Sequence, residues 1–419
     1  MKRISLMQNV SLTYIPSDKF KTSLLSAQMV VPLKKETAGW NALLVNTLGR
    51  GTQSCSDLTQ LSRKLDLLYG ARLEPVVRKK GENQIVGFLA SCIDDRFLPR
   101  GVRLLEPLAD LMGELFSAPA GGSLRKDYVQ SEGENLAELI RSDVNDKRAY
   151  AGRRLLEEMC GKEPYGINRL GQADEVESIT ADALDAYYRT LLPTARFELF
   201  YCGSAPLERV EQALTHAFSP IPRAEPCLAP APTLRYPAPS APRMVTEEMD
   251  VGQGKLCMGF RTVSEDTVAA MLLNNLYGGT SSSRLFLHVR EKLSLCYYVG
   301  STFHRKKGIY TVSAGIECCN YQRASDEILE QLEILRLGQW EDWELEGARS
   351  SLRNALRSVE DSAGGLEDFT MGQLATGGRE TLAELLSSAD KVDADRMQKA
   401  ARAITLDTVY FLKAKEGTR

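Results

Sequence analysis

Residues 274–300 read NNLYGGTSSSRLFLHVREKLSLCYYVG, and this stretch says most about how the chain folds. An apolar helix-like run stops at a Gly-Gly pair, and the serines that follow can cap a second helix. Its apolar residues share one stripe, made of Leu285, Val289 and Leu293. Arg290 lies on a different face, and seven positions later Tyr297 opens an alternating, aromatic-rich strand.

Length and composition place the chain among ordinary globular proteins. Its 419 residues are long for one core and suit two domains of about 200 residues each. A net charge of -3 without a long basic block argues against nucleic-acid binding. The start of the chain lacks the apolar core of a signal peptide, and no apolar run is long enough for a membrane span.

The cysteine pattern indicates a reducing compartment. Nine cysteines are scattered along the chain and none are spaced as C-x-x-C, which argues against a zinc ribbon or a disulfide framework. Cys318 and Cys319 are adjacent, but neighbouring cysteines form a disulfide only with strain, so we treat them as separate thiols. We therefore expect a cytoplasmic protein.

A proline-rich segment marks the expected domain boundary. Residues 219–243 hold eight of the 17 prolines, at 220, 222, 226, 230, 232, 237, 239 and 242. Such a segment favours an extended conformation rather than a helix or a central strand. We expect one domain over 1–218, a linker over 219–243 and a second domain over 244–419.

The two halves repeat one pattern. Residues 48–75 and 276–303 both run from a Gly-Thr turn through serines and an amphipathic helix to a tyrosine that enters a strand. Residues 179–203 and 392–417 both read as a capped helix followed by a strand. A repeat near 200 residues indicates a duplicated domain. The expected fold class is α+β, with each domain an antiparallel sheet covered by helices.

The expected elements follow from periodicity. Strands of the first half are expected near 4–15, 22–32, 72–79, 83–92 and 196–203. Its helices are expected near 38–47, 56–68, 97–117, 125–140, 147–160 and 181–191. Strands of the second half are expected near 244–250, 254–262, 296–304 and 308–316. Its helices are expected near 265–277, 282–293, 322–337, 341–357, 381–388 and 394–402.

The blocks SSRLF, VREK and LCY within residues 278–297 resemble the C-terminal half of the pitrilysin family of zinc peptidases, which includes insulin-degrading enzyme and the mitochondrial processing peptidase. The resemblance implies two homologous domains arranged as half of a clamshell. It also implies that Arg290 and Tyr297 bind the substrate backbone by donating hydrogen bonds to carbonyl oxygens. EPYG at 163–166, followed by Gly171, resembles a further stretch of the family.

The zinc motif of the resembled family is missing. Its members bind zinc through H-x-x-E-H on a helix, with the glutamate as general base. Residues 37–52, TAGWNALLVNTLGRGT, occupy that place and put Ala42 and Asn46 at the histidine positions and Val45 at the glutamate. The only histidines are His216, His288 and His304, without metal-ligand spacing. Asn46 could bind a substrate backbone or cap local structure.

The family's third ligand, a glutamate on a later helix, has two candidates here. They are Glu132 and Glu134, and without the histidines we expect both on a solvated helix face.

Alternatives to peptide binding are weaker. The pattern alone would favour Arg290 as a surface arginine paired with Glu291, but its spacing to Tyr297 within the longer match favours substrate contact. The run GGTSSSR lacks the lysine and the preceding strand of a phosphate-binding loop. No motif supports Ser-His-Asp catalysis.

The resemblance therefore implies the non-catalytic, substrate-positioning subunit of a heterodimeric zinc metalloendopeptidase, as in bacterial two-chain members. This chain would hold no cofactor, and zinc would lie in a homologous partner subunit with intact H-x-x-E-H. Substrates would be unfolded or short peptides, and the isolated chain could form a homodimer. The alternative is an inactive peptide-binding or scaffolding protein without a role in proteolysis.

Overall fold

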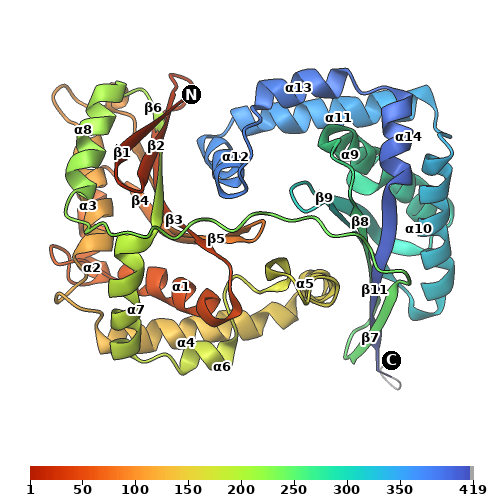
Figure 1. The fold of residues 1–419 in the computed structure, drawn as a ribbon, viewed down its shortest axis with the longest axis horizontal. Coiled ribbons are helices and arrows are strands. Elements are labelled where there is room, and N and C mark those ends of the chain that lie inside the picture. The colour runs from red at the N-terminus through yellow and green to blue at the C-terminus, as the bar shows by residue number, and fades with distance from the viewer. Residues whose placement is uncertain (416–419) are drawn as a thin grey trace. The chain divides into compact units, whose positions relative to one another are not determined.

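The computed structural model describes residues 1–415, which form two compact units, each built on one sheet (Figure 1). The first unit contains residues 1–141, 167–232 and 362–378. The second contains residues 142–166, 233–361 and 379–415. Among the described residues, no helix is both long and apolar enough to cross a membrane.

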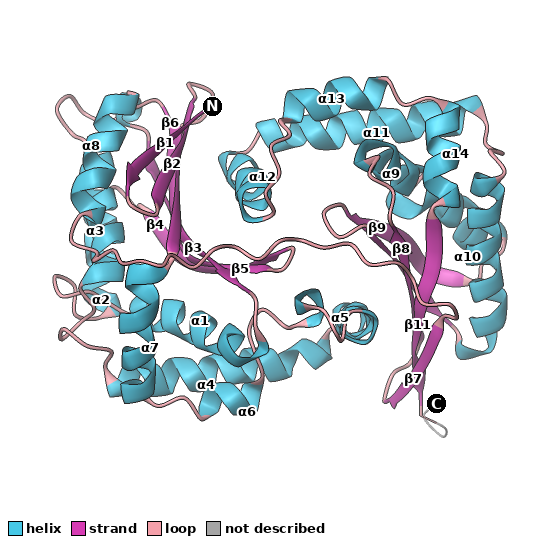
Figure 2. Cartoon of the chain, in the orientation of Figure 1, coloured by secondary structure: helices cyan, strands magenta, loops and turns pink. Residues whose placement is uncertain are grey.

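The sheet of the first unit has the order β1-β2-β6-β3-β5-β4. Its strands are β1 (Lys2–Met7), β2 (Val10–Pro16), β3 (Thr22–Pro32), β4 (Arg72–Lys80), β5 (Asn83–Ile93) and β6 (Arg196–Gly203). One face packs against α1 (Lys35–Leu48), α3 (Leu105–Ser117), α7 (Ala181–Thr194) and α8 (Leu207–Phe218) (Figure 2). The other α-helices that the first half of the sequence gives to this unit are α2 (Leu58–Leu67), α4 (Lys126–Ser142) and α6 (Ala173–Glu177).

The sheet of the second unit has the order β7-β11-β8-β10-β9. Its strands are β7 (Arg243–Met249), β8 (Gly254–Thr262), β9 (Cys296–His304), β10 (Ile309–Ile316) and β11 (Ile404–Ala414). The α-helices that the second half of the sequence gives to this unit are α9 (Thr267–Asn274), α10 (Tyr321–Arg336), α11 (Asp342–Glu360), α13 (Leu382–Asp390) and α14 (Ala394–Arg402).

The two sheets share one topology, which agrees with a duplicated domain. Strands β2, β6, β3, β5 and β4 correspond in order to β7, β11, β8, β10 and β9. The expected antiparallel sheets covered by helices are observed, with one exception in each sheet. In each sheet one pair is parallel, β2 with β6 and β7 with β11, because the last strand of each half lies between β2 and β3, or between β7 and β8.

Several expected elements differ from the observed ones. The strand expected at 4–15 is two strands, β1 and β2, joined by a tight turn at Asn9, whose φ is 60°. The helix expected from 97 begins only at Leu105, because Pro99 and Gly101 interrupt the preceding segment. Helix α8 and α12 (Ala363–Ala375) were not expected at all.

Each sheet receives a helix from the other half of the sequence. Helix α5 (Lys147–Met159) packs on β8 and β11, and α12 packs on β3 and β6. The approach of α5 is so close that a Cβ at Gly259 would lie 2.6 Å from the sulfur of Met159. The expected boundary at 219–243 remains a prediction. By its contacts, segment 142–166 belongs to the second unit, and segment 362–378 belongs to the first unit.

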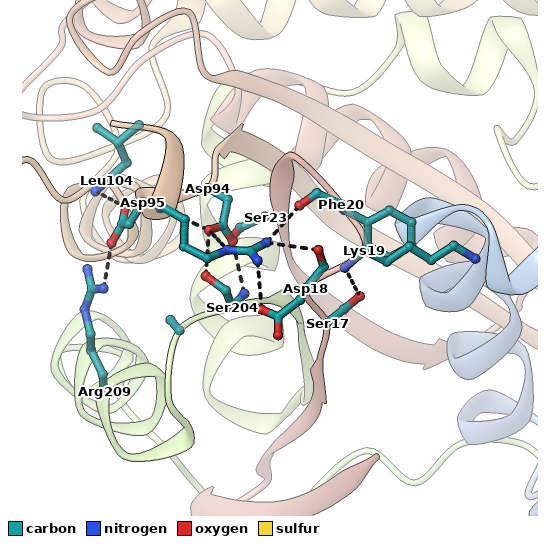
Figure 3. Close-up of polar contacts among 12 residues, drawn as sticks. Ser17, Asp18, Lys19, Phe20, Ser23, Asp94, Asp95, Leu104, Ser204 and Arg209 are labelled. Carbon is teal, nitrogen blue, oxygen red and sulfur yellow. Dashed lines mark hydrogen bonds and ion pairs between the residues drawn. The ribbon is translucent and has the colours of Figure 1, made fainter. Parts of the chain in front are cut away.

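A buried carboxylate ties together the ends of strands in the first unit. Asp94 follows β5, is 1% exposed, and accepts hydrogen bonds from the Ser23 and Ser204 hydroxyls at 2.9 and 2.6 Å (Figure 3). Burial would raise its pKa, but hydrogen bonds from Ser204 and Arg96 outweigh burial and lower the pKa to about 2. Figure 3 also shows Arg209 of α8 reaching Asp95, which holds α8 beside the end of β5.

Helix α12 carries a second buried carboxylate, Glu367, into the first unit. Glu367 is fully buried and accepts hydrogen bonds from Ser26 and Gln28 of β3 at 3.0 and 2.8 Å. Arg78 of β4 lies 2.6 Å from its other oxygen and supplies the balancing charge. Burial raises the pKa of Glu367, and the charge of Arg78 opposes part of that rise.

Loss of the Arg78 charge should destabilise the packing of α12. Arg78→Ala would leave the Glu367 carboxylate buried without a cation, which costs roughly 2 to 3 kcal/mol of unfolding free energy for a partly exposed pair. Glu367→Gln, the matched control, keeps hydrogen bonds to β3 and should cost clearly less. Urea unfolding of both variants gives the comparison, and equal losses would contradict the importance of the buried charge.

Candidate functional site

Arg290 lies in η5 (Leu285–Lys292), a π-helix rather than the expected regular helix over 282–293. Leu285 and Val289 are fully buried, but Leu293 is 37% exposed, because the helical winding ends before it. The guanidinium of Arg290 lies 4.7 Å over the ring of Phe286. Its side chain is 42% exposed.

The surface pairing considered for Arg290 is present in a weak form. Its Nε atom lies 3.6 Å from a carboxylate oxygen of Glu291, whose side chain is 54% exposed. Exposed ion pairs at this separation contribute little. The contact therefore leaves Arg290 available to a ligand.

A buried arginine that the sequence interpretation missed fixes the same helix. Arg284 directly precedes η5 and is 8% exposed. Its Nε donates to Gln331 of α10 at 2.9 Å, and its Nη1 lies 3.0 Å from Glu344 of α11. A charged residue between serines and an apolar run gave the signal for it, but sequence alone could not identify its partners.

Tyr297 lies on β9, the edge strand of the second sheet, and is 56% exposed. Its hydroxyl donates a hydrogen bond of 2.7 Å to Glu317, which follows β10. This hydrogen bond, together with the charge of Glu317, raises the pKa of Tyr297. Sequence reasoning did not identify Glu317, because it lies 20 positions away from Tyr297 along the chain.

The neighbouring Tyr298 points elsewhere, as alternation along a strand predicts. Its ring lies over Gly315, where an added Cβ would be 2.4 Å from a ring carbon. The guanidinium of Arg148 covers the ring at 4.2 Å. Tyr298 therefore packs within the second unit, whereas Tyr297 faces solvent.

Helix η5 and strand β9 pack against one another, which brings the two candidate residues onto adjacent elements. Burial raises the pKa of Cys296, the residue before Tyr297, to about 11, and the positive charge of Arg290 opposes that rise. Arg290 is therefore near the start of β9. Each candidate residue has its own acidic neighbour, Glu291 for Arg290 and Glu317 for Tyr297.

The positions aligned with the zinc motif do not fit a metal. Ala42 and Val45 are fully buried in the apolar core of the first unit, and Asn46 is half-buried on the same helix. Alanine and valine carry no donor atom, so zinc cannot bind there through these residues. Within residues 1–415, no group of three or more His, Cys, Asp or Glu side chains could hold a metal ion.

Polar side chains beside these positions satisfy each other. Asn41 donates to Gln84 at 2.8 Å and accepts from the Tyr187 hydroxyl at 2.7 Å. Burial raises the pKa of Tyr187 to about 12. This network connects α1, β5 and α7, and it gives a structural role to residues that lie next to the positions aligned with the zinc motif.

The two carboxylates considered as a third ligand have different surroundings. Glu132 lies 3.1 Å from Arg50, and its side chain is only 13% exposed, so the expectation of a solvated face was wrong for it. Arg50 also lies over the ring of Tyr128 at 5.2 Å. Glu134 is exposed and accepts a hydrogen bond from Gln130, as expected for a solvated face.

The EPYG stretch has a structural role in the second unit. Glu163 is buried between Arg261, at 2.5 Å, and Lys307, at 2.8 Å. Tyr165 contacts the Nδ1 atom of His304 at 2.9 Å. Gly171, in the first unit, has a φ of +79°, and a Cβ there would lie 2.6 Å from the backbone of Gly39.

Comparisons with known proteins agree with the resemblance. A family model described as the peptidase M16 inactive domain matches residues 178–352. A Bacillus subtilis protein described as probable inactive metalloprotease YmfF is 33% identical over 409 residues, covering 96% of this chain and 95% of that protein.

Solved structures agree as well. A conserved protein from Enterococcus faecalis has a TM-score of 0.90 and 27% identity, covering 100% of this chain and 99% of that one. A peptidase M16 inactive domain from Pseudomonas fluorescens, at 15% identity and a TM-score of 0.79, covers 100% of this chain and 99% of that one and shares the fold. The chain therefore belongs to the M16, or pitrilysin, family of peptidases.

Proposed function

We propose that this chain is the non-catalytic, substrate-positioning subunit of a heterodimeric zinc metalloendopeptidase. One observation supports this most: Arg290 and Tyr297 are exposed on adjacent elements, while Ala42 and Val45 close the former metal position with apolar side chains. A protein with only a scaffolding role would have no need for an exposed arginine and phenol at this spacing.

The division of labour follows from the chemistry of the residues. The partner subunit supplies zinc and the general base for water attack. The peptide binds as an added strand on a sheet edge of that subunit. Arg290 donates hydrogen bonds to a peptide carbonyl and stabilises negative charge that develops there.

The proposal includes a location and a class of substrate. Both subunits would act in a reducing cytoplasm, which the free thiols of all nine cysteines support. Substrates would be unfolded or short peptides, because only an extended backbone can pair with a sheet edge.

Isolation of the chain from its native cells tests the partnership. We expect a roughly stoichiometric partner of similar size that carries H-x-x-E-H, identified by mass spectrometry of the bound proteins. Recovery of a homodimer alone would contradict the heterodimer. Recovery with unrelated assemblies would favour a peptide-binding or scaffolding protein without proteolysis.

Substitution of Arg290 tests the positioning role. In the assembled pair, Arg290→Ala should lower the peptidase rate by about 10²-fold, as does loss of other transition-state donors. Lys292→Ala is the matched control, because Lys292 is an exposed cation at the end of the same helix. An unchanged rate in Arg290→Ala, or equal losses in both variants, would contradict the role given to Arg290.

The metal content of the two subunits should differ. Purified alone, this chain should retain no stoichiometric zinc, because positions 42 and 45 offer no donor atoms. Elemental analysis after gel filtration measures this, with the H-x-x-E-H subunit as positive control. One tightly bound zinc per chain would overturn the alignment of residues 42–46.

A further inference from the structure

We propose that Glu317 is a positioning residue that turns the Tyr297 hydroxyl into a hydrogen-bond acceptor for a peptide N–H. This inference rests on the proposed function, because it states whether one residue of the same peptide site donates or accepts a hydrogen bond. It also departs from the expectation that both Arg290 and Tyr297 donate to carbonyl oxygens.

The regular pairing of β9 with β10 is interrupted at Tyr297. In the pairing of β9 with β10, Tyr298 lies opposite Gly315 and Cys296 lies opposite Ile316. Tyr297 is therefore the extra residue of a β-bulge, without a partner on β10. A bulge redirects a side chain, and bulges occur often beside functional sites.

Glu317 is held in place directly after the other strand, β10. Its neighbour Ile316 is fully buried, and its own carbonyl accepts a hydrogen bond from the Asn320 N–H at 2.9 Å. This contact opens η6 (Cys318–Asn320), the turn that leads into α10. The Glu317 side chain is exposed, and its carboxylate meets the Tyr297 hydroxyl from this fixed backbone.

The Tyr297 hydroxyl donates its single proton in the hydrogen bond to Glu317. An ionised carboxylate can only accept hydrogen bonds, and a phenol has one proton to donate. The separation of 2.7 Å is short, as expected for a hydrogen bond to a charged acceptor. The lone pairs of the phenol oxygen therefore remain for a donor, and a peptide backbone offers its N–H group.

Arg290 is the hydrogen-bond donor that complements Tyr297 as an acceptor. A guanidinium can only donate, so Arg290 is suited to a carbonyl oxygen, while Tyr297 is suited to an N–H. Both side chains are exposed, and they come from elements that pack on one another. An extended peptide presents carbonyl and N–H groups in turn along its edge, so such a pair recognises the direction of the backbone without reading its side chains.

A purely structural role explains the contact poorly. Tyr297 is 56% exposed and Glu317 is exposed, and a hydrogen bond between solvated groups adds little to stability. Buried contacts such as Arg284 with Glu344 already hold η5 within the second unit. The hydrogen bond instead fixes the direction in which one hydroxyl points.

The hydrogen bond can be tested apart from any ligand. In protein carrying ¹³C-labelled tyrosine rings, the Tyr297 signal is identified by its loss in Tyr297→Phe, and its ionisation is followed against pH by NMR. In Glu317→Ala the phenol should ionise at lower pH than in wild type, because the carboxylate disfavours the phenolate. Tyr298→Phe should leave the Tyr297 titration unchanged. An identical Tyr297 titration in wild type and Glu317→Ala would overturn the proposal.

A second experiment tests whether the Tyr297 hydroxyl accepts a hydrogen bond from a peptide N–H. It uses a fluorescent, unstructured peptide and copies of it methylated at one backbone nitrogen at a time. The full-length chain is used in the complex in which it is isolated from cells. One methylated position should bind wild type about tenfold more weakly, as the loss of one hydrogen bond predicts. That sensitivity should disappear in Tyr297→Phe and shrink in Glu317→Ala.

The control variant is Glu291→Ala, which removes the carboxylate beside Arg290 and should preserve the wild-type pattern. The same methylation pattern in wild type and Glu317→Ala would overturn this inference alone. Loss of binding to every peptide, in wild type as well, would overturn both this inference and the proposed function. An intact pattern together with an unchanged peptidase rate in Arg290→Ala would overturn only the catalytic part of the proposed function.

Discussion

Burial of both faces of each sheet is the constraint on which the rest of the structure depends. Strand β3 is buried from Ser23 to Val31, its polar residues Ser26 and Gln28 included. Helices of its own half cover one face, and α12, from the far half of the sequence, covers the other. Helix α5 does the same for β8 and β11 in the second unit. Neither sheet is therefore completed by its own half of the sequence.

Charged side chains at these helix–sheet contacts make the packing specific. Glu367 of α12 meets hydroxyl, amide and guanidinium donors from the first sheet, and all of them lie within one unit. In the second unit, Glu163 follows α5 and is enclosed by Arg261 and Lys307. A buried carboxylate without such partners is costly, so each helix is stable in one position on its sheet.

The candidate site follows the opposite rule, because its polar groups stay accessible. Arg290 and Tyr297 keep large exposed fractions, whereas Arg284, a few residues earlier, is buried and fully engaged. Rigid neighbours thus support exposed donors and acceptors. At the positions aligned with the zinc motif the arrangement is reversed, since Ala42 and Val45 are part of the core and carry no polar donor atom.

The sequence by itself determined the elements that periodicity controls: the duplicated order of strands and helices, the position of Arg290 before Tyr297, and the loss of donor atoms at positions 42 and 45. These depend on residue type and short-range spacing. Only the tertiary structure decided that α5 and α12 cross to the opposite sheets, that β6 pairs in parallel with β2 and β11 with β7, and that Glu317 meets Tyr297. Such contacts join residues far apart in the chain, and their energy comes from burial and charge pairing that no local pattern encodes.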